Sequence, residues 1–237
     1  MGRWGRSRGC GSWARWRTCS GPWPPSRATA PGDAALRQLA AEKTLARLET
    51  FARDTGWPID KRIRYGDRAC PSLVRIAEQL ASAMDLRSGR REVAMHGDLC
   101  FSNLLWDSRN RRIKAIDPRG AVDRAPTLHG DLRYDLAKLA HSVVGRYDQI
   151  IAGRYALSAD GEIAFDPVAC QPWLEGALAD LVVDGQGGLS QPVRAVMASL
   201  FLSMLPLHAD RPDRQQAFLA NALRLWCELD GSLRAAA

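Results

Sequence analysis

The chain has 237 residues and a mass of 26.1 kDa, with 46% hydrophobic and 25% charged residues, which is the composition of an ordinary soluble globular domain. Its formal net charge of +7 is concentrated at the N-terminus, because residues 1–32 contain six arginines and no acidic residue. The other 27 basic residues nearly balance the 26 acidic ones, so the folded part is near neutral and its composition does not argue for nucleic-acid binding.

The cysteines and the apolar segments indicate a reduced setting away from membranes. The six cysteines are scattered without a C-x-x-C pair or the spacing of a metal site, as in cytosolic proteins with free thiols. The longest apolar run, Ala195–Leu207, is interrupted by two serines and is too short to span a bilayer. The basic N-terminus lacks the apolar segment of a signal peptide. We therefore predict a cytoplasmic protein with neither a membrane nor a nucleic acid as partner, and the sequence leaves the oligomeric state open.

Residues 1–32 differ from the rest of the chain. They contain four of the eight tryptophans, interspersed with Arg, Gly, Ser and Pro, and show neither helical nor strand periodicity. Such a segment cannot bury enough apolar surface to offset the entropy cost of ordering its backbone. We interpret it as a disordered leader, or as a spurious one from a misplaced start or an altered reading frame, with a functional basic arm as the alternative.

From Asp33 onward, helical periodicity dominates the pattern. A first helix is predicted to be capped by Asp33 and to end at Gly56 and Pro58. A second helix is predicted to follow Pro71 and to end near Ser88. Four further helices are predicted at about residues 131–152, 172–183, 191–205 and 214–229.

Two β-hairpins are predicted between these helices. Residues 103–106 and 112–116 are short apolar segments joined by the polar turn 107–110, and a smaller hairpin surrounds Ala159–Gly161. Helices outweigh strands throughout. The predicted fold class is therefore α+β, mostly helical, with residues 33–234 as one folded unit.

The segment Met95–Gly120 carries the strongest indication of chemistry. It contains H-G-D-L-C-F-S-N, then the first predicted hairpin, then I-D-P-R-G. Asp98 and Asn103 lie in one loop, and Asp117 ends the second strand of the hairpin. Carboxylate and amide oxygens are hard ligands that suit Mg²⁺ together with substrate phosphates. A further carboxylate can orient or accept the proton of an attacking hydroxyl group.

These motifs resemble those of the aminoglycoside phosphotransferase and choline kinase-like family, a variant of the protein-kinase pattern H-R-D-L-x-x-x-N followed by D-F-G. The segments G-D-L-R-Y-D-L-A from Gly130 and L-P-L-H-A-D from Leu205 add to the resemblance, which covers about Leu36 to Leu229. It implies a protein-kinase-like fold, of which this chain would be the C-terminal lobe with a small catalytic-loop hairpin.

Carried over residue by residue, the resemblance implies that Asp98 is the catalytic base. It implies that Asn103 and Asp117 are ligands of the Mg²⁺ that binds with ATP. His96 and Asp135 are expected to support the loop, His96 by hydrogen bonding and Asp135 by bracing it from behind. The implied reaction is the ATP-dependent transfer of the γ-phosphoryl group to a hydroxyl group of a small molecule.

The N-terminal lobe of that family is not recognisable in this sequence. No segment before the second helix is typical of a five-stranded sheet, and no strand contains a lysine of the V-A-I-K type. We therefore interpret the chain as a C-terminal lobe whose N-terminal lobe is largely missing through truncation. A catalytically inactive kinase-like remnant or binding module is the alternative, and a metal-dependent phosphohydrolase is a third hypothesis.

The acceptor stays open at this point. Glu175, Asp180 and Asp184 are candidate contacts for a cationic acceptor, and a solvated helix face explains them at least as well. A sugar, an amino alcohol and an aminoglycoside all remain possible acceptors.

Overall fold

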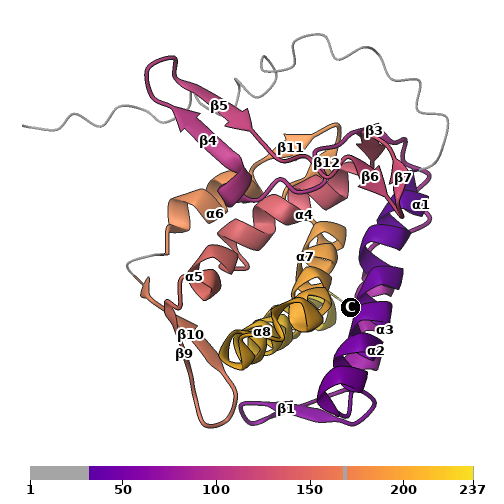
Figure 1. Cartoon of the computed structure of the whole chain (residues 1–237), viewed down its shortest axis with the longest axis vertical. Coiled ribbons are helices and arrows are strands. Elements are labelled where there is room, and N and C mark those ends of the chain that lie inside the picture. The colour runs from indigo at the N-terminus through magenta and orange to yellow at the C-terminus, as the bar shows by residue number, and fades with distance from the viewer. Residues whose placement is uncertain (1–31, 168–169, 237) are drawn as a thin grey trace, which may run out of the picture.

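The computed structural model describes residues 32–167 and 170–236, and about half of these residues lie in helices. The leader predicted at residues 1–32 therefore lies almost entirely outside the described residues. The fold is mixed α and β, with the helices forming the body and the strands forming short pairs around it (Figure 1). None of the described helices combines the length and the hydropathy that a bilayer-spanning segment needs.

The first predicted helix is present as one continuous helical stretch. It comprises α1 (Gly32–Leu36), a π-helical segment (Arg37–Glu42) and α2 (Lys43–Thr55), and it ends at Gly56, whose φ of 72° is left-handed. The predicted capping role of Asp33 is wrong. Its carboxylate is buried and accepts hydrogen bonds from Ser88, Gly89 and Arg133 instead of from the first turn of its own helix.

The second predicted helix is confirmed as α3 (Leu73–Ala83), and Ser72 caps it by accepting a hydrogen bond from the backbone N–H of Arg75. It ends about one turn earlier than predicted, because the carbonyls of Met84 and Asp85 turn toward the guanidinium of Arg133. A short hairpin, β1 (Ile63–Tyr65) with β2 (Arg68–Cys70), precedes α3 and was not predicted.

The core lies around two C-terminal helices, α7 (Gln191–Met204) and α8 (Pro212–Ala236). Figure 1 shows them between the α2 and α3 pair on one side and α4 (Leu132–Val143) on the other. Every residue of α7 from Ala195 to Met204 is buried, because this helix packs against α2, α3, α4 and α8. A helix that is apolar on all sides belongs at the centre of a domain.

The prediction of one long helix at residues 131–152 is wrong, because the helix is interrupted near its centre. It is divided into α4 and α5 (Tyr147–Ile151), and Arg146 between them has a left-handed φ of 56°. Gly145 packs closely at the break, where an added Cβ would lie 2.6 Å from the ring of Phe201. Asn221 of α8 donates a 2.7 Å hydrogen bond to the freed carbonyl of Gly145. Tertiary packing therefore ends a helix that the local pattern continues.

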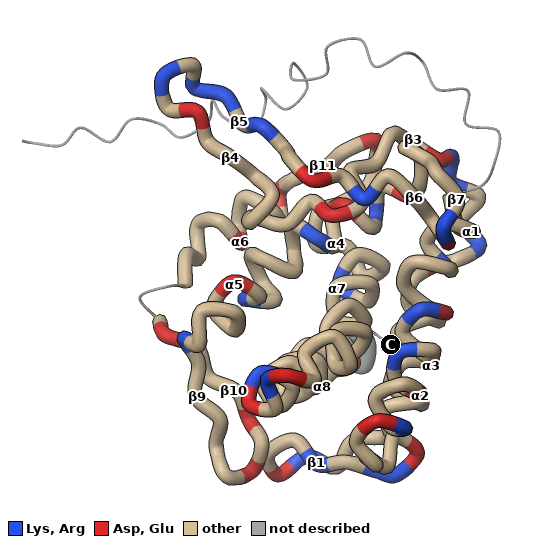
Figure 2. Tube along the Cα trace, viewed as in Figure 1, with Lys and Arg blue, Asp and Glu red and all other residues tan. Residues whose placement is uncertain are grey.

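The two predicted hairpins are confirmed. The first, β4 (Leu104–Asp107) with β5 (Arg112–Ala115), extends away from the helical body in Figure 1, and its turn and β5 are rich in basic residues in Figure 2. The second pairs β9 (Tyr155–Leu157) with β10 (Ile163–Phe165).

The remaining strands are each two residues long and form three pairs. The helix predicted at residues 172–183 is shorter, because α6 (Pro172–Ala179) ends before a turn between β11 (Val182–Val183) and β12 (Gln186–Gly187). Each sheet in the described residues has two strands. The short pairs are β3 (Val93–Ala94) with β8 (His129–Gly130), β6 (Ala121–Val122) with β7 (Ala125–Pro126), and β11 (Val182–Val183) with β12 (Gln186–Gly187).

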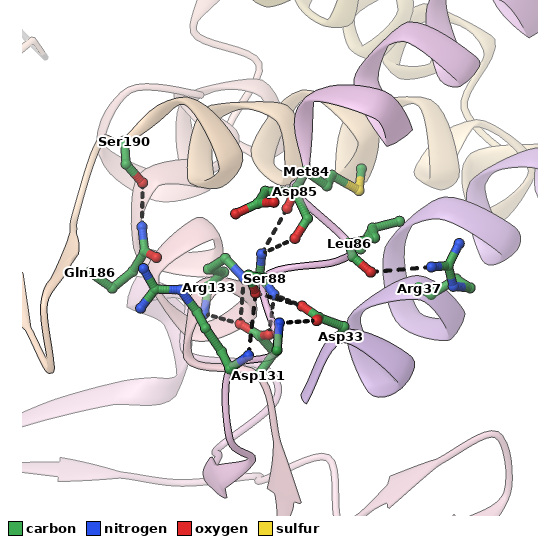
Figure 3. A network of polar contacts seen from close by, with 12 residues as sticks. Asp33, Arg37, Met84, Asp85, Leu86, Ser88, Asp131, Arg133, Gln186 and Ser190 are labelled. Carbon is green, nitrogen blue, oxygen red and sulfur yellow. Dashed lines mark hydrogen bonds and ion pairs between the residues drawn. The ribbon is translucent and has the colours of Figure 1, made fainter. Parts of the chain in front are cut away.

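A buried ionic network fixes the start of α1 to the start of α4 (Figure 3). The fully buried guanidinium of Arg133 lies 2.5 Å from the carboxylates of both Asp33 and Asp131. Burial opposes the charge of Asp33, but the hydrogen bonds from Ser88 and Arg133 outweigh it and hold the pKa of Asp33 below its usual value. The network thus joins the first described helix to the segment that supports the catalytic-loop motif.

Candidate active site

The loop after β3 contains the H-G-D motif and turns at Gly97. This glycine has a left-handed φ of 77°, and an added Cβ would lie 2.7 Å from the Cβ of Arg119. Only glycine meets both conditions without strain. Arg119 belongs to the segment after β5, so the close approach joins the loop to the end of the hairpin.

Asp135 of α4 holds this loop from below. Its two carboxylate oxygens accept 2.8 Å hydrogen bonds from the backbone N–H groups of His96 and Gly97. Burial raises the pKa of Asp135, and these two hydrogen bonds act in the opposite direction. The imidazole Nδ1 of His96 accepts a bond of 3.3 Å from the backbone N–H of Asp98. Both residues expected to support the loop therefore contact its backbone.

Asp98 is placed between a lysine and an amide. Its Oδ1 lies 2.7 Å from Nζ of Lys138, and its Oδ2 lies 3.2 Å from Nδ2 of Asn103, which also donates a 2.8 Å bond to the Asp98 carbonyl. About a third of the Asp98 side chain is exposed. The carboxylate is thus oriented from both sides and still reaches solvent, as a general base requires.

Asn103 and Asp117 lie at the same end of the β4–β5 hairpin. The backbone N–H of Ile116 donates a 3.0 Å bond to the Asn103 carbonyl, which continues the register that pairs Leu104 with Ala115. Asp117 follows directly, is exposed, and has a φ of 57°. The pairing therefore brings the two predicted metal ligands to one strand end.

The donors at this strand end fit a magnesium ion. Asn103 uses its Nδ2 for Asp98, which leaves its Oδ1 for a cation, and no hydrogen bond or ion pair engages the Asp117 carboxylate within the described residues. An amide oxygen, a carboxylate and water match the preference of Mg²⁺ for few protein ligands. The described residues hold no cluster of three or more His, Cys, Asp or Glu side chains suited to a metal.

Arg119 links the H-G-D loop to α4. Its Nε donates a 3.0 Å bond to the Gly97 carbonyl, its Nη2 donates a 3.0 Å bond to the Tyr134 hydroxyl, and its guanidinium lies over the Tyr134 ring. The backbone N–H of Arg119 also donates to the His96 carbonyl at 2.8 Å. The side chain therefore fixes the loop against α4.

A cavity of about 290 Å³ opens next to Asp98, between α2, α4 and α7. Three basic residues that sequence reasoning did not assign to the site line it with Asp98, namely Lys43, Arg47 and Lys138. One signal was present for Lys138, a lysine that interrupts the apolar run Leu136–Ala140. Lys43 and Arg47, four residues apart on the first helix, gave no signal of their own because only the fold brings α2 beside the loop.

The acidic residues considered for a cationic acceptor lie elsewhere. Glu175 pairs with Arg146 at a separate cavity, and Asp180 and Asp184 are exposed.

The two lysines at the cavity have shifted pKa values. Burial is the largest influence on Lys138 and lowers its pKa, but Tyr134 and Asp98 outweigh burial and leave the pKa above its usual value. Burial, followed by the charge of Arg119, lowers the pKa of Lys43 to about 8. The site is thus rich in cations on the side of Asp98 that faces the cavity.

A loop carboxylate that can accept a proton, next to an amide and a carboxylate that can hold a cation, is the kind of site that phosphoryl transfer requires. The model of the phosphotransferase enzyme family (APH) matches residues 26–176, which is more than half of the chain. The chain belongs to this family. Comparisons with curated proteins and with solved structures gave no match.

Proposed function

We propose that this chain is an ATP-dependent phosphotransferase that moves the γ-phosphoryl group to a hydroxyl group of a small molecule. The observation that carries the proposal is the position of Asp98. It is oriented by Lys138 and Asn103, lines a cavity through its contact with Lys138, and contacts Asn103, which lies at the same hairpin end as Asp117. Membership of the phosphotransferase family supports the same reaction class.

Each side chain then has one task. Asp98 accepts the proton of the acceptor hydroxyl, and Lys138 keeps the carboxylate turned toward the cavity. Asn103 and Asp117 would hold Mg²⁺, which supplies neutralisation of the phosphate charges when it is bound with ATP. Asp135 and Arg119 hold the loop in shape from opposite sides. Most of the catalysis is therefore positioning.

We also propose that residues 33–234 form a choline kinase-like C-terminal lobe that carries the catalytic residues. Within the described part, residues 32–92 form helices and the β1–β2 hairpin, and no larger sheet that could cover a nucleotide. The β4–β5 hairpin exposes 50% of Leu105 and 61% of Trp106 near the proposed metal ligands. This apolar surface is suited to contact the nucleotide base.

The test is phosphoryl transfer from radiolabelled Mg-ATP to a panel of hydroxyl compounds, with Asp98→Asn compared with the matched change Asp67→Asn in the exposed β1–β2 turn. Asp98→Asn should lower kcat by about 10²–10⁴-fold, the contribution of general-base assistance, and Asp67→Asn should not. Equal rates for the two variants would refute the role of Asp98. No transfer by the unmodified chain would favour the inactive remnant.

A further inference from the structure

The two oxygens of Asp98 face different surroundings. Oδ1 contacts Lys138, which lines the cavity, whereas Oδ2 contacts Asn103. Neither Asn103 nor Asp117 lines the cavity. If the phosphoryl donor lies with the metal at the strand end, the cavity is on the opposite, acceptor side of the base.

Positively charged side chains outnumber carboxylates around this cavity. Lys43, Arg47, Arg119 and Lys138 line it, and Asp98 is the one carboxylate among its lining residues. Lys138 is paired with Asp98, and Arg47 and Arg119 donate to the oxygens of Ser203, Gly97 and Tyr134. The side-chain ammonium of Lys43 has no hydrogen bond or ion pair within the described residues. The nearby cations depress its pKa further than burial alone does, which indicates that positive charge is in excess here.

A buried polar group with unused hydrogen-bonding capacity lies on the same wall. His141 of α4 is 1% exposed, and neither ring nitrogen has a hydrogen-bond partner within the described residues. Its ring packs between Tyr147 and Phe201, with centroid distances of 4.6 and 4.2 Å. Burial, and then the charge of Lys138, lowers its pKa well below the usual value, so the ring is neutral and can donate through one nitrogen. Buried polar groups of this kind normally have partners, which points to a ligand.

We propose that the acceptor is a small anionic hydroxy compound, a carboxylate- or phosphate-bearing alcohol, whose anionic group binds at Lys43 and Arg47 while its hydroxyl group meets Asp98. This inference rests on the proposed function and names its substrate class. A cationic acceptor such as an amino alcohol would face four like charges at this wall, and like charges brought together without water oppose binding. The volume of about 290 Å³ is at the lower limit of small-molecule pockets, which suits an acceptor of a few carbon atoms.

The test measures binding by calorimetry on the full chain, so that it does not depend on turnover. The anionic probes are D-glycerate, glycerol 3-phosphate and D-gluconate. Their counterparts are the neutral glycerol and sorbitol and the cationic serinol and glucosamine. At least one anionic probe should bind about 10-fold or more tightly than its counterparts, because a hydrogen bond to a charged group is stronger than one between neutral groups. The proposal fails if no anionic probe binds, or if the neutral or cationic members bind as tightly.

Variants on α2 locate the site. Lys43→Met should weaken binding of the anionic probe about 10- to 100-fold, and Lys43→Arg should retain it. Arg53→Met removes one exposed charge from the same helix and should leave binding unchanged. Equal binding by Lys43→Met and Arg53→Met would overturn the proposal. So would a loss of Mg-ATP binding in Lys43→Met with anion binding intact, because the cations would then serve the nucleotide.

The same measurements separate this inference from the proposed function. Binding of an anionic probe that depends on Lys43, in a chain that transfers no phosphate to any acceptor, would support the ligand class and contradict the reaction. Transfer that depends on Asp98 but favours glycerol or serinol would support the reaction and overturn the ligand class.

Discussion

Replacing Arg133 with methionine should be one of the most damaging single changes in the described part of the chain. The guanidinium makes five hydrogen bonds of 2.5–2.8 Å, to Asp33, to Asp131 and to the carbonyls of Met84 and Asp85. Methionine would fill the space and leave two carboxylates, 7% and 2% exposed, without a cation. Removing one partner of a buried ion pair costs about 3–5 kcal/mol, because the remaining charge stays desolvated.

Urea unfolding, followed by tryptophan fluorescence, measures this loss of unfolding free energy. The midpoint urea concentration should fall while the dependence of the free energy on urea concentration stays constant. The matched control is Arg75→Met, since Arg75 pairs with Glu78 on α3 at the same 2.5 Å but with both side chains largely exposed. This control should hardly move the midpoint, because exposed pairs are screened by solvent. A loss of about 1 kcal/mol or less for Arg133→Met, the size of an exposed pair, would refute the role assigned to the network.

The same variant should change the response to acid. The pKa of Asp33 is lowered in the folded state, because the hydrogen bonds of Ser88 and Arg133 outweigh burial. A lowered carboxyl pKa contributes stability that is complete above the unfolded value and is lost as the pH falls through the folded one. The unmodified chain should therefore lose more stability below about pH 4 than Arg133→Met does. Parallel acid titrations of the two proteins would contradict this account.

Three further predictions concern the site. Asp117→Ala should weaken binding of Mn²⁺, used as a probe for Mg²⁺ and measured by electron paramagnetic resonance in the presence of ATP, by about 10-fold or more; unchanged binding would exclude Asp117 as a ligand. Because the pKa of Lys43 is lowered to about 8, its charge is lost as the pH rises through 8, so affinity for an anionic probe should fall between pH 7 and 9, and Lys43→Arg should remove that dependence. Gly97→Ala should cost about 1–3 kcal/mol in urea unfolding and more than Gly153→Ala, because both glycines have positive φ but an added Cβ meets Arg119 at Gly97 and open space at Gly153. Equal losses for the two glycine variants would show that the contact contributes nothing.

The elements that the sequence predicted well are those whose local signals and tertiary environment agree. α3 has a capping serine and one apolar face, and the β4–β5 hairpin has its polar turn between two short apolar strands. The failures occur where packing overrides the local pattern. The helix predicted through residues 131–152 breaks because Gly145 must lie against Phe201, a contact about fifty residues away that no local pattern contains.

The same difference between local pattern and tertiary packing applies to the residues of the candidate site. Asp98, Asn103 and Asp117 lie within one segment of the sequence, so their spacing along a loop and a hairpin was enough to suggest that they meet, and the structure places them around one strand end. Lys43 and Lys138 are separated by about a hundred residues. They meet at the cavity because α2 and α4 both pack on α7, which is a property of the whole fold.

This difference bears on where acceptor specificity resides. The residues proposed for the base and the metal come from a single hairpin and its loop, which Asp135, Lys138 and Arg119 fix to α4. The cations at the cavity come from helices whose positions depend on the core packing around α7. A change in α2, which carries Lys43 and Arg47, can therefore exchange one acceptor for another while α4 still holds the residues proposed for phosphoryl transfer. For that reason the nature of the acceptor should be inferred from the cavity, and the motif alone cannot identify it.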